Sequence, residues 1–555
     1  MRKKVLGDVD VVAMSGTHVV FLGFDMPKSA AKRLMGYAIY RKDKTELEGY
    51  WLRSIKTFES IDQLAGNEDA SSHEAPFQSF QWADYTAKPG HEYVYTVYPM
   101  TGTPGNLKEG NPTAVSISTE DEDPVDDSPY GIHFNRGVIS SQAYVKRFGL
   151  VSPEKAGPAA FEWLTRDLLP AMLAFISKAN AGWSLHCAFY EFQYPAVIQA
   201  LKDAKKRGAD VHVLYGATPD TETTTANEEA LATEGTTNYF KPRTNAKIPH
   251  NKFMVLSKGK TPKSVWTGST NVSTSALFGQ LNVGIVADNS DVAKLYRAFW
   301  EALSADPETA DLRTTLEDLV PLDVANSEPV QVIFSPMKGT AVYDYYTQLA
   351  AGAQAGLFMT FPFGMSTEFR DVYDHKDGVL RYSLLDKYVN GGTPESRKAA
   401  IADTIRIRKF PNIMMALGSS ITVDSVDGWR KEKGPLGVHV HWVHTKFMLV
   451  DPFSKRPTVV SGSANWSLPS TNANDENMLI IRGDRRVADI YFGEFMRIFA
   501  HHRFREALAI HLKEHGSVDD WKPNFLKDNP DEWVPKHYEN GGRYQIQRVY
   551  FSTLS

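Results

Sequence analysis

Two short segments far apart in the chain carry the same polar residues at the same spacing. The segment H-N-K-F-M begins at His250 and H-T-K-F-M begins at His444, and a Gly-Ser-x-Asn sequence follows at the same distance from each histidine. The matching polar residues are His250 with His444, Lys252 with Lys446, Ser269 with Ser463, and Asn271 with Asn465. Apolar residues of a duplicated core recur for packing reasons, but four polar types do not. We therefore interpret the repeat as functional.

These residue types suit the cleavage of a phosphodiester. One neutral imidazole can attack phosphorus, and a second, protonated imidazole can donate to the leaving oxygen. Lys252 and Lys446 would supply fixed positive charge for the phosphate oxygens, in place of a metal ion. Asparagine amides and serine hydroxyls would add hydrogen-bond donors. The repeat predicts one active site built from both copies, with no cofactor and no metal.

The double motif resembles the phospholipase D superfamily, whose signature is His-x-Lys-x4-Asp followed by Gly-Ser/Gly-x-Asn. The resemblance covers roughly residues 136–515, and the second copy is complete with Asp451, whereas the first has Ser257 at that position. It implies a metal-independent phosphodiesterase that works through a phosphohistidine. By the same resemblance, His250 is the nucleophile, His444 the acid/base and Asp451 a mainly supportive residue.

A second asymmetry lies beyond the Gly-Ser-x-Asn sequences, at equal distances from the two histidines. There the first copy has Asn282 and the second has Glu476. A carboxylate can orient an imidazole by accepting its other N–H. We expect Glu476 to do this for one histidine, although the sequence does not say which. Asn282 lacks the charge, but its amide oxygen could still accept.

Three further residues lie near these motifs in the sequence. Glu191 follows an apolar run, and we interpret it as a solvated strand end rather than as a residue of the cleft. Trp266 and Trp466 flank the two Gly-Ser sequences and could pack in the core or contact a substrate. A three-histidine metal site formed by His439, His441 and His444 is not expected, because strand alternation puts His444 on the opposite face.

The chain divides into a β-rich part and a longer α/β part. Strand-like runs at Val19–Gly23, Gly36–Arg41 and Glu92–Pro99, separated by turn sequences, predict a β-sandwich that resembles a fibronectin type III domain. Strand-helix-strand order occurs twice later, around Trp183–Tyr215 and Val330–Phe363, after a long helix predicted over Pro153–Ala179. The expected divisions are a sandwich at 1–118, an acidic linker at 119–135, phospholipase D-like halves at 136–325 and 326–515, and a C-terminal tail at 516–555. The predicted fold class is α/β, with two pseudo-symmetric α/β sandwich halves preceded by an all-β sandwich domain.

Composition limits the compartment and the partners. The 555 residues have a formal net charge of −5, without the basic excess of a dedicated duplex-DNA binder. With Cys187 as the single cysteine, the chain can form no internal disulfide. No signal-peptide pattern and no transmembrane run are visible, so we expect a cytoplasmic protein, with peripheral attachment to membranes open.

The substrate class remains open at this stage. Phospholipid at a membrane surface, with hydrolysis or transphosphatidylation, is the first choice. A nuclease is the alternative, and a degenerate, non-catalytic phosphate-binding module is another. A lipid enzyme should have an apolar rim at its cleft, a nuclease a basic groove, and a binding module a blocked or distorted histidine pair. The β-domain could in addition bind a protein partner.

Overall fold

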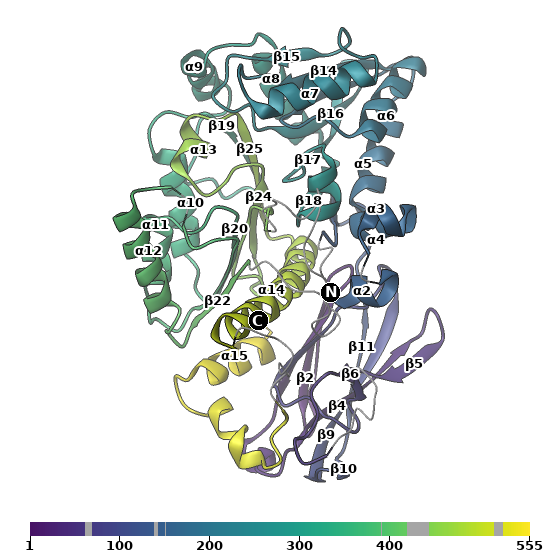
Figure 1. The fold of residues 1–555 in the computed structure, drawn as a ribbon, viewed down its shortest axis with the longest axis vertical. Coiled ribbons are helices and arrows are strands. Elements are labelled where there is room, and N and C mark those ends of the chain that lie inside the picture. The colour runs from purple at the N-terminus through teal and green to yellow at the C-terminus, as the bar shows by residue number, and fades with distance from the viewer. Residues whose placement is uncertain are drawn as a thin grey trace.

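The computed structural model describes residues 1–61, 69–137, 142–149, 151–389, 391–418, 443–515 and 525–554. In Figure 1 the N-terminal strands lie at one end of the molecule, and the teal and green α/β parts occupy the other. None of the described helices is both long enough and apolar enough to cross a lipid bilayer.

The first 118 residues contain two larger antiparallel sheets packed face to face and a short two-stranded sheet of β6 (Arg53–Ser54) and β7 (Ala70–Ser71). One sheet has the order β1 (Arg2–Val5), β2 (Asp10–Ser15), β3 (Val20–Asp25) and β8 (Gln81–Asp84). The other has the order β10 (Asn106–Glu109), β9 (Glu92–Thr103), β4 (Gly36–Asp43) and β5 (Glu48–Trp51), with β11 (Thr113–Ser118) also on β9. Tyr93, Tyr95 and Val97 alternate along β9 and are fully buried, as expected for a strand with one face in a core. The predicted all-β domain is confirmed, and its likeness to fibronectin type III stays a prediction.

Two seven-stranded sheets follow, and they share one topology. The first has the order β12 (Tyr130–Phe134), β18 (Val283–Ala287), β17 (Thr261–Gly268), β16 (Lys252–Lys258), β13 (Trp183–Phe189), β14 (Asp210–Gly216) and β15 (Lys241–Arg243). The second has the order β19 (Val330–Ser335), β25 (Glu476–Arg482), β24 (Thr458–Gly462), β23 (Phe447–Val450), β20 (Gly356–Phe361), β21 (Leu380–Leu385) and β22 (Ile413–Leu417). Each strand pair is parallel or antiparallel in both sheets alike. The predicted pair of related α/β halves is thereby confirmed.

Helices cover both sheets. In the first half they are α2 (Gln142–Phe148), α3 (Pro153–Ala156), α4 (Pro158–Thr165), α5 (Leu168–Ser177), α6 (Pro195–Lys206), α7 (Glu222–Thr233), η1 (Ser275–Gly279), α8 (Ser290–Ser304) and α9 (Thr309–Leu319). In the second half they are α10 (Ala341–Ala351), α11 (Thr367–Tyr373), α12 (Pro394–Ile407), α13 (Leu468–Asn472) and α14 (Arg485–His515). The single helix predicted over Pro153–Ala179 is three helices, because Gly157 and Arg166 both adopt a positive φ and so leave the helical region.

The two halves pack against each other through aromatic side chains. Phe334 of β19 stacks on Phe299 of α8 in the first half, with ring centroids 4.2 Å apart. In return, Phe134 of β12 meets Tyr491 of α14 in the second half at 5.2 Å, edge to face. Buried aromatic pairs of this kind add to the stabilisation from apolar burial. One continuous core therefore joins the inner faces of both sheets.

Two expected boundaries differ from the structure. The segment 119–135, expected as a linker, contains β12, which pairs with β18 as the edge strand of the first seven-stranded sheet. The described part of 516–555, expected as a tail, ends in α15 (Arg543–Ser552), which packs on β3 and β21. Trp533 is buried in the sandwich core and donates its indole N–H to the Leu34 carbonyl at 3.2 Å. The apolar residues of these segments are buried in the fold, although the polar residues around them made the segments look like a linker and a tail in the sequence.

Candidate active site

Both motif histidines line one cleft between the two halves. The cleft has a volume of about 800 Å³, and its wall includes His250, Asn271, His444 and Asn465. Each histidine lies just before the middle strand of its sheet, β16 or β23, so the shared topology brings equivalent ends of the two sheets together. A parallel bridge between Leu281 and Val443 links the halves beside the histidines.

Each histidine is oriented by a residue of the opposite half. The Nδ1 of His250 lies 2.9 Å from both carboxylate oxygens of Glu476. The Nδ1 of His444 lies 2.8 Å from the Oδ1 of Asn282. The Asn282 amide nitrogen donates to the Ala276 carbonyl at 2.9 Å, which turns the amide oxygen toward His444. Because the Oδ1 of Asn282 accepts, the Nδ1 of His444 carries a proton, and an ionised Glu476 fixes the same tautomer in His250, in which Nε2 is the nitrogen that can react.

The motif serines hold these orienting residues in place. Ser463 Oγ donates to Glu476 at 2.6 Å, and Ser269 Oγ donates to Asn282 at 2.8 Å. Each hydroxyl also accepts a backbone N–H from the strand that follows, that of Asn477 at 3.0 Å and that of Val283 at 3.1 Å. The serines were predicted as donors for the substrate, but their protons are used for positioning.

The two motif lysines are fully buried beneath the histidines. Lys252 Nζ donates to the His250 carbonyl and Lys446 Nζ to the His444 carbonyl, each at 2.6 Å. Burial lowers the pKa of Lys252 to about 8, an effect that the charge of Glu476 partly offsets. Burial also lowers the pKa of Lys446 well below its ordinary value, and the charge of Lys252 lowers it further. The positive charge of Lys252 thus acts on Lys446, although neither lysine is among the residues that line the cleft.

The same charges act on His250 and Glu476. Burial lowers the pKa of His250 well below its ordinary value, and the positive charges of Lys252 and Lys446 add to this. Burial raises the pKa of Glu476 to about 8, against the opposing charge of the lysines. At neutral pH the environment thus favours an uncharged His250, which is the form a nucleophile needs.

The two motif asparagines keep hydrogen-bonding capacity in the cleft. Asn271 and Asn465 both line it, and their Oδ1 atoms are buried without a hydrogen-bond partner among the described residues. These oxygens can only accept hydrogen bonds, as can the oxygens of a phosphodiester, so a bound phosphodiester could be served only by the amide N–H groups of the two residues.

Asp451, predicted as part of the active site, lies elsewhere. Its carboxylate accepts the backbone N–H groups of Gln354, Ala355 and Gly356 at 2.7–3.1 Å, where β20 begins. At about 3.3 Å per residue, the length of β23 puts Asp451 at the far end of the strand from His444. Ser257 occupies the matching place in the first half, buried and opposite Ser184 of β13. Ser257, which replaces the aspartate of the family pattern, therefore does not line the cleft.

Other expectations need correction or extension. Glu191 lines the cleft and is not a solvated strand end. Trp266 is buried in the core of the first half, whereas Trp466 lines the cleft and donates its indole N–H to the Thr360 carbonyl at 2.8 Å. His439 and His441 lie outside the described residues. The sequence reasoning missed further residues that line the cleft: Tyr190, Ile248, Ser275, Gln280, Phe363, Met365 and Val389. They belong to no motif, although Tyr190 is the last residue of the apolar run that precedes Glu191.

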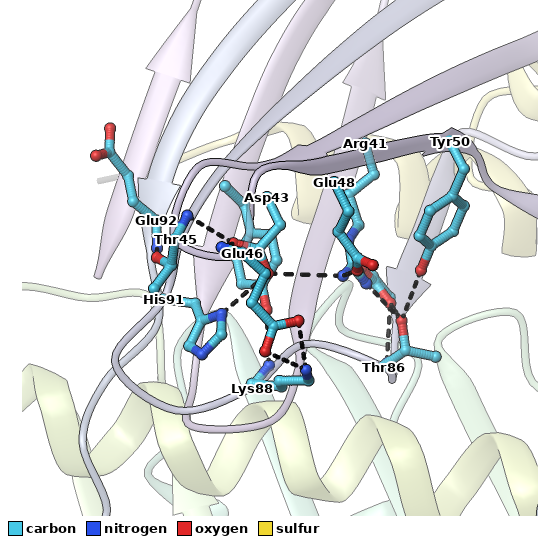
Figure 2. A network of polar contacts seen from close by, with 12 residues as sticks. Arg41, Asp43, Thr45, Glu46, Glu48, Tyr50, Thr86, Lys88, His91 and Glu92 are labelled. Carbon is cyan, nitrogen blue, oxygen red and sulfur yellow. Dashed lines mark hydrogen bonds and ion pairs between the residues drawn. The ribbon is translucent and has the colours of Figure 1, made fainter.

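A cluster of acids that could hold a metal ion lies far from the cleft, in the β-domain. Among the described residues, the group with ligand spacing consists of Asp43, Glu46 and Glu48. Figure 2 shows that each already has a basic partner: Asp43 has His91, Glu46 has Lys88 and Glu48 has Arg41. We therefore assign this cluster to the structure of the β4–β5 turn.

Comparison with known proteins agrees with this geometry. Residues 172–303 and 418–499 match the family model described as "Cardiolipin synthase, PLD-like domain". No curated protein matches the sequence of this chain.

Several solved structures are similar to parts of the chain. A polyphosphate kinase from Porphyromonas gingivalis is 12% identical, with a TM-score of 0.37, and the match covers 71% of this chain and 54% of the kinase. A phosphatidylserine synthase from Haemophilus influenzae is 13% identical, with a TM-score of 0.42, covering 70% of this chain and 94% of that one. The phospholipase D family member Nuc from Salmonella typhimurium is 23% identical, with a TM-score of 0.21, covering 25% and 87%. This chain thus spans about half the length of the kinase. One segment matched by the family model lies in each half and contains one His-x-Lys motif, so each half is similar in sequence to that PLD-like domain.

Proposed function

We propose that this protein is a metal-independent phosphodiesterase that forms a phosphohistidine and acts on phospholipids. The carrying observation is the reciprocal orientation of His250 by Glu476 and of His444 by Asn282 across one cleft. Two imidazoles held through their Nδ1 atoms at one cleft, together with two buried ammonium groups, match what phosphodiester cleavage requires.

The reaction has two steps. His250 Nε2 attacks phosphorus while the bond to the leaving alcohol breaks, and His444 donates its Nε2 proton to that alcohol oxygen. His444, now neutral, then takes a proton from water or from a second alcohol, and the resulting oxygen nucleophile displaces His250. Water gives hydrolysis, and an alcohol gives transphosphatidylation. Lys252 and Lys446 balance the charge on the non-bridging oxygens in both steps.

The unequal orienting residues support this division of roles. Phosphorylation on Nε2 leaves a positively charged ring if Nδ1 keeps its proton, and the Glu476 carboxylate stabilises that charge on His250. Asn282 offers His444 an acceptor of equal geometry but no charge. A protonated His444 is therefore a stronger acid than it would be beside a carboxylate.

The composition of the cleft supports a lipid substrate over a polynucleotide. Its apolar wall is formed by Tyr190, Ile248, Phe363, Met365, Val389, Trp466 and Pro469. Among the described residues that line it, none is Lys or Arg, whereas binding along a nucleic acid needs exposed cations for the neighbouring phosphates. A non-catalytic module is disfavoured because both histidines keep their orienting partners and reach the cleft.

The test is the activity of the purified protein on phospholipid micelles and on labelled single- and double-stranded DNA and RNA. We expect release of the headgroup alcohol from phospholipid and loss of that activity in His250→Ala and His444→Ala. Cleavage of nucleic acid without any activity on phospholipid would indicate a nuclease instead. Binding of these substrates without turnover of any of them would favour the phosphate-binding module.

A further inference from the structure

The two walls of the cleft differ at one pair of equivalent positions. Cys187 of β13 pairs with Met254, and Met359 of β20 pairs with Met448. Because Met254 and Met448 each stand four residues after their motif histidine, Cys187 and Met359 are equivalent. Four residues further along each chain segment come Glu191 and Phe363, and both line the cleft. At this equivalent position, the first half therefore has a carboxylate and the second half has a benzyl ring.

The backbone around Glu191 is tied to both motifs of its half. The N–H of Tyr190 donates to the carbonyl of Asn251, next to His250, at 2.9 Å. The N–H of Val272, next to Asn271, donates to the Glu191 carbonyl at 3.1 Å. Residues held between two strands of a site in this way keep a fixed position when a ligand binds.

The carboxylate of Glu191 has capacity for a ligand. Its side chain is half-buried, and among the described residues no hydrogen bond or ion pair engages it. Its negative charge reaches the reactive centre, since it partly offsets the lowering by burial of the pKa of both Lys252 and Lys446. A partly desolvated carboxylate without a partner is costly, and a cation from the substrate would relieve that cost.

The wall around Phe363 has the opposite character. Met365 and Val389 line the cleft beside it, and the Lys387 ammonium lies 5.4 Å from the centroid of the Phe363 ring. An apolar group gains from burial there, whereas a second cation would be repelled. The two sides of the cleft therefore suit the two unlike alcohols of an amphiphilic phosphodiester.

We propose that Glu191 is a specificity-determining residue that binds a cationic group on one alcohol of the substrate, while the apolar alcohol lies toward Phe363. This inference rests on the proposed phosphodiesterase function and narrows the substrate to phospholipids whose headgroup carries an amine or a quaternary ammonium. A headgroup without positive charge leaves Glu191 unpaired, and an anionic polymer meets its repulsion. If Glu191 only balanced the buried lysines, its removal would instead affect all substrates equally.

The experiment compares kcat/KM for phosphatidylcholine and phosphatidylglycerol in mixed micelles of one non-ionic detergent. We expect the wild-type protein to prefer phosphatidylcholine and Glu191→Gln to reduce that preference by about tenfold, the effect of losing one charge-assisted contact. Glu229→Gln on α7 makes the same charge change at an exposed site and should leave the preference unchanged.

An unchanged preference in Glu191→Gln, or a wild-type preference for phosphatidylglycerol or for nucleic acid, would overturn the inference. A soluble diester, bis(4-nitrophenyl) phosphate, separates the two levels of the proposal. If the protein turns over this diester and both lipids, and Glu191→Gln has the same ratio of kcat/KM for the two lipids as the wild type, only the role of Glu191 is excluded. Absence of turnover on all three substrates removes the proposed function itself, and the inference with it.

Discussion

His444 of the second half binds Asn282 of the first half through Nδ1 and Oδ1, 2.8 Å apart. Asn282 occupies the position that Glu476 occupies in the other copy, where the carboxylate binds His250. The two imidazoles thus have the same geometry but different electrostatic surroundings, and this difference yields the first prediction.

Asn282→Asp should move one limb of the pH–kcat profile. A carboxylate beside His444 favours the imidazolium, so the pKa of His444 rises and its acid form persists to higher pH. The alkaline limb should shift upward by about 1–2 pH units. In the matched variant Glu476→Gln, loss of the carboxylate lowers the pKa of His250, so the acidic limb should move to lower pH, and kcat should fall by roughly 10³-fold. Unmoved limbs in both variants would separate these residues from the titrating histidines.

His444→Ala should accumulate a covalent intermediate. A nitrophenyl phosphodiester has a leaving group that needs no acid, so the first step should still occur, and the second should stall without a base. Mass spectrometry after quenching should find the phosphoryl group on the peptide that contains His250. His250→Ala should show neither adduct nor turnover. An adduct on His444 in the wild-type protein would reverse the two roles.

Activity should survive chelation. In the proposed mechanism, two buried ammonium groups would supply the charge that a divalent ion supplies in many phosphodiesterases. We therefore expect unchanged turnover in EDTA, measured before and after addition of Mg²⁺, Zn²⁺ or Ca²⁺ in excess. Full loss of activity with rescue by one of these ions would favour a metal-dependent mechanism.

Lys252→Met should stabilise the fold while it abolishes activity. Burial lowers the folded-state pKa of Lys252 to about 8. At pH 7 the charged form is therefore less stable in the folded protein than in the unfolded chain, although Lys252 stays mostly protonated. Replacing it should raise the free energy of unfolding by about 2 kcal/mol after loss of the bond to the His250 carbonyl. Between about pH 8 and pH 10.4, Lys252 binds fewer protons in the folded protein than in the unfolded chain. The free energy of unfolding of the wild-type protein therefore rises with pH in this range, and the difference in stability between Lys252→Met and the wild type becomes smaller.

Urea denaturation at pH 7 and pH 9.5 checks this. Lys258→Met, an exposed site at the end of the same strand, is the control and should leave the free energy of unfolding nearly unchanged, because surface substitutions seldom alter stability. A loss of stability in Lys252→Met at pH 7 would show that the ammonium contributes net stabilisation.

Asp451→Asn should reduce stability and spare chemistry. The carboxylate accepts backbone N–H groups of Gln354, Ala355 and Gly356, and an amide can replace only part of this. We expect a loss of about 1–2 kcal/mol in the free energy of unfolding, with kcat per folded molecule nearly constant. Asp451→Ser, which reproduces the residue of the first copy, should behave in the same way. A large fall in kcat at unchanged stability would restore a catalytic role.

Much of the architecture was predictable because it depends on local patterns. Apolar runs of strand length around amphipathic helices indicated both α/β units. The structure has β13, α6 and β14 over the expected Trp183–Tyr215 and β19, α10 and β20 over the expected Val330–Phe363. Boundaries were less predictable, since β12 sits inside an acidic stretch that has little apolar pattern of its own. The position of Asp451 could have been anticipated, because a strand that begins at Phe447 carries its end away from His444.

The sequence by itself determined that His250, Lys252, His444 and Lys446 belong to one repeated motif, because four polar types recurred at one spacing. Only the tertiary structure decided that Glu476 orients His250 and that Asn282 orients His444, since these contacts join residues 226 and 162 positions apart. The same holds for Glu191 and Phe363, whose equivalence depends on the register of two separate sheets. Spacing along a chain records what one strand or helix can present, whereas a site between two halves depends on how their buried faces pack together.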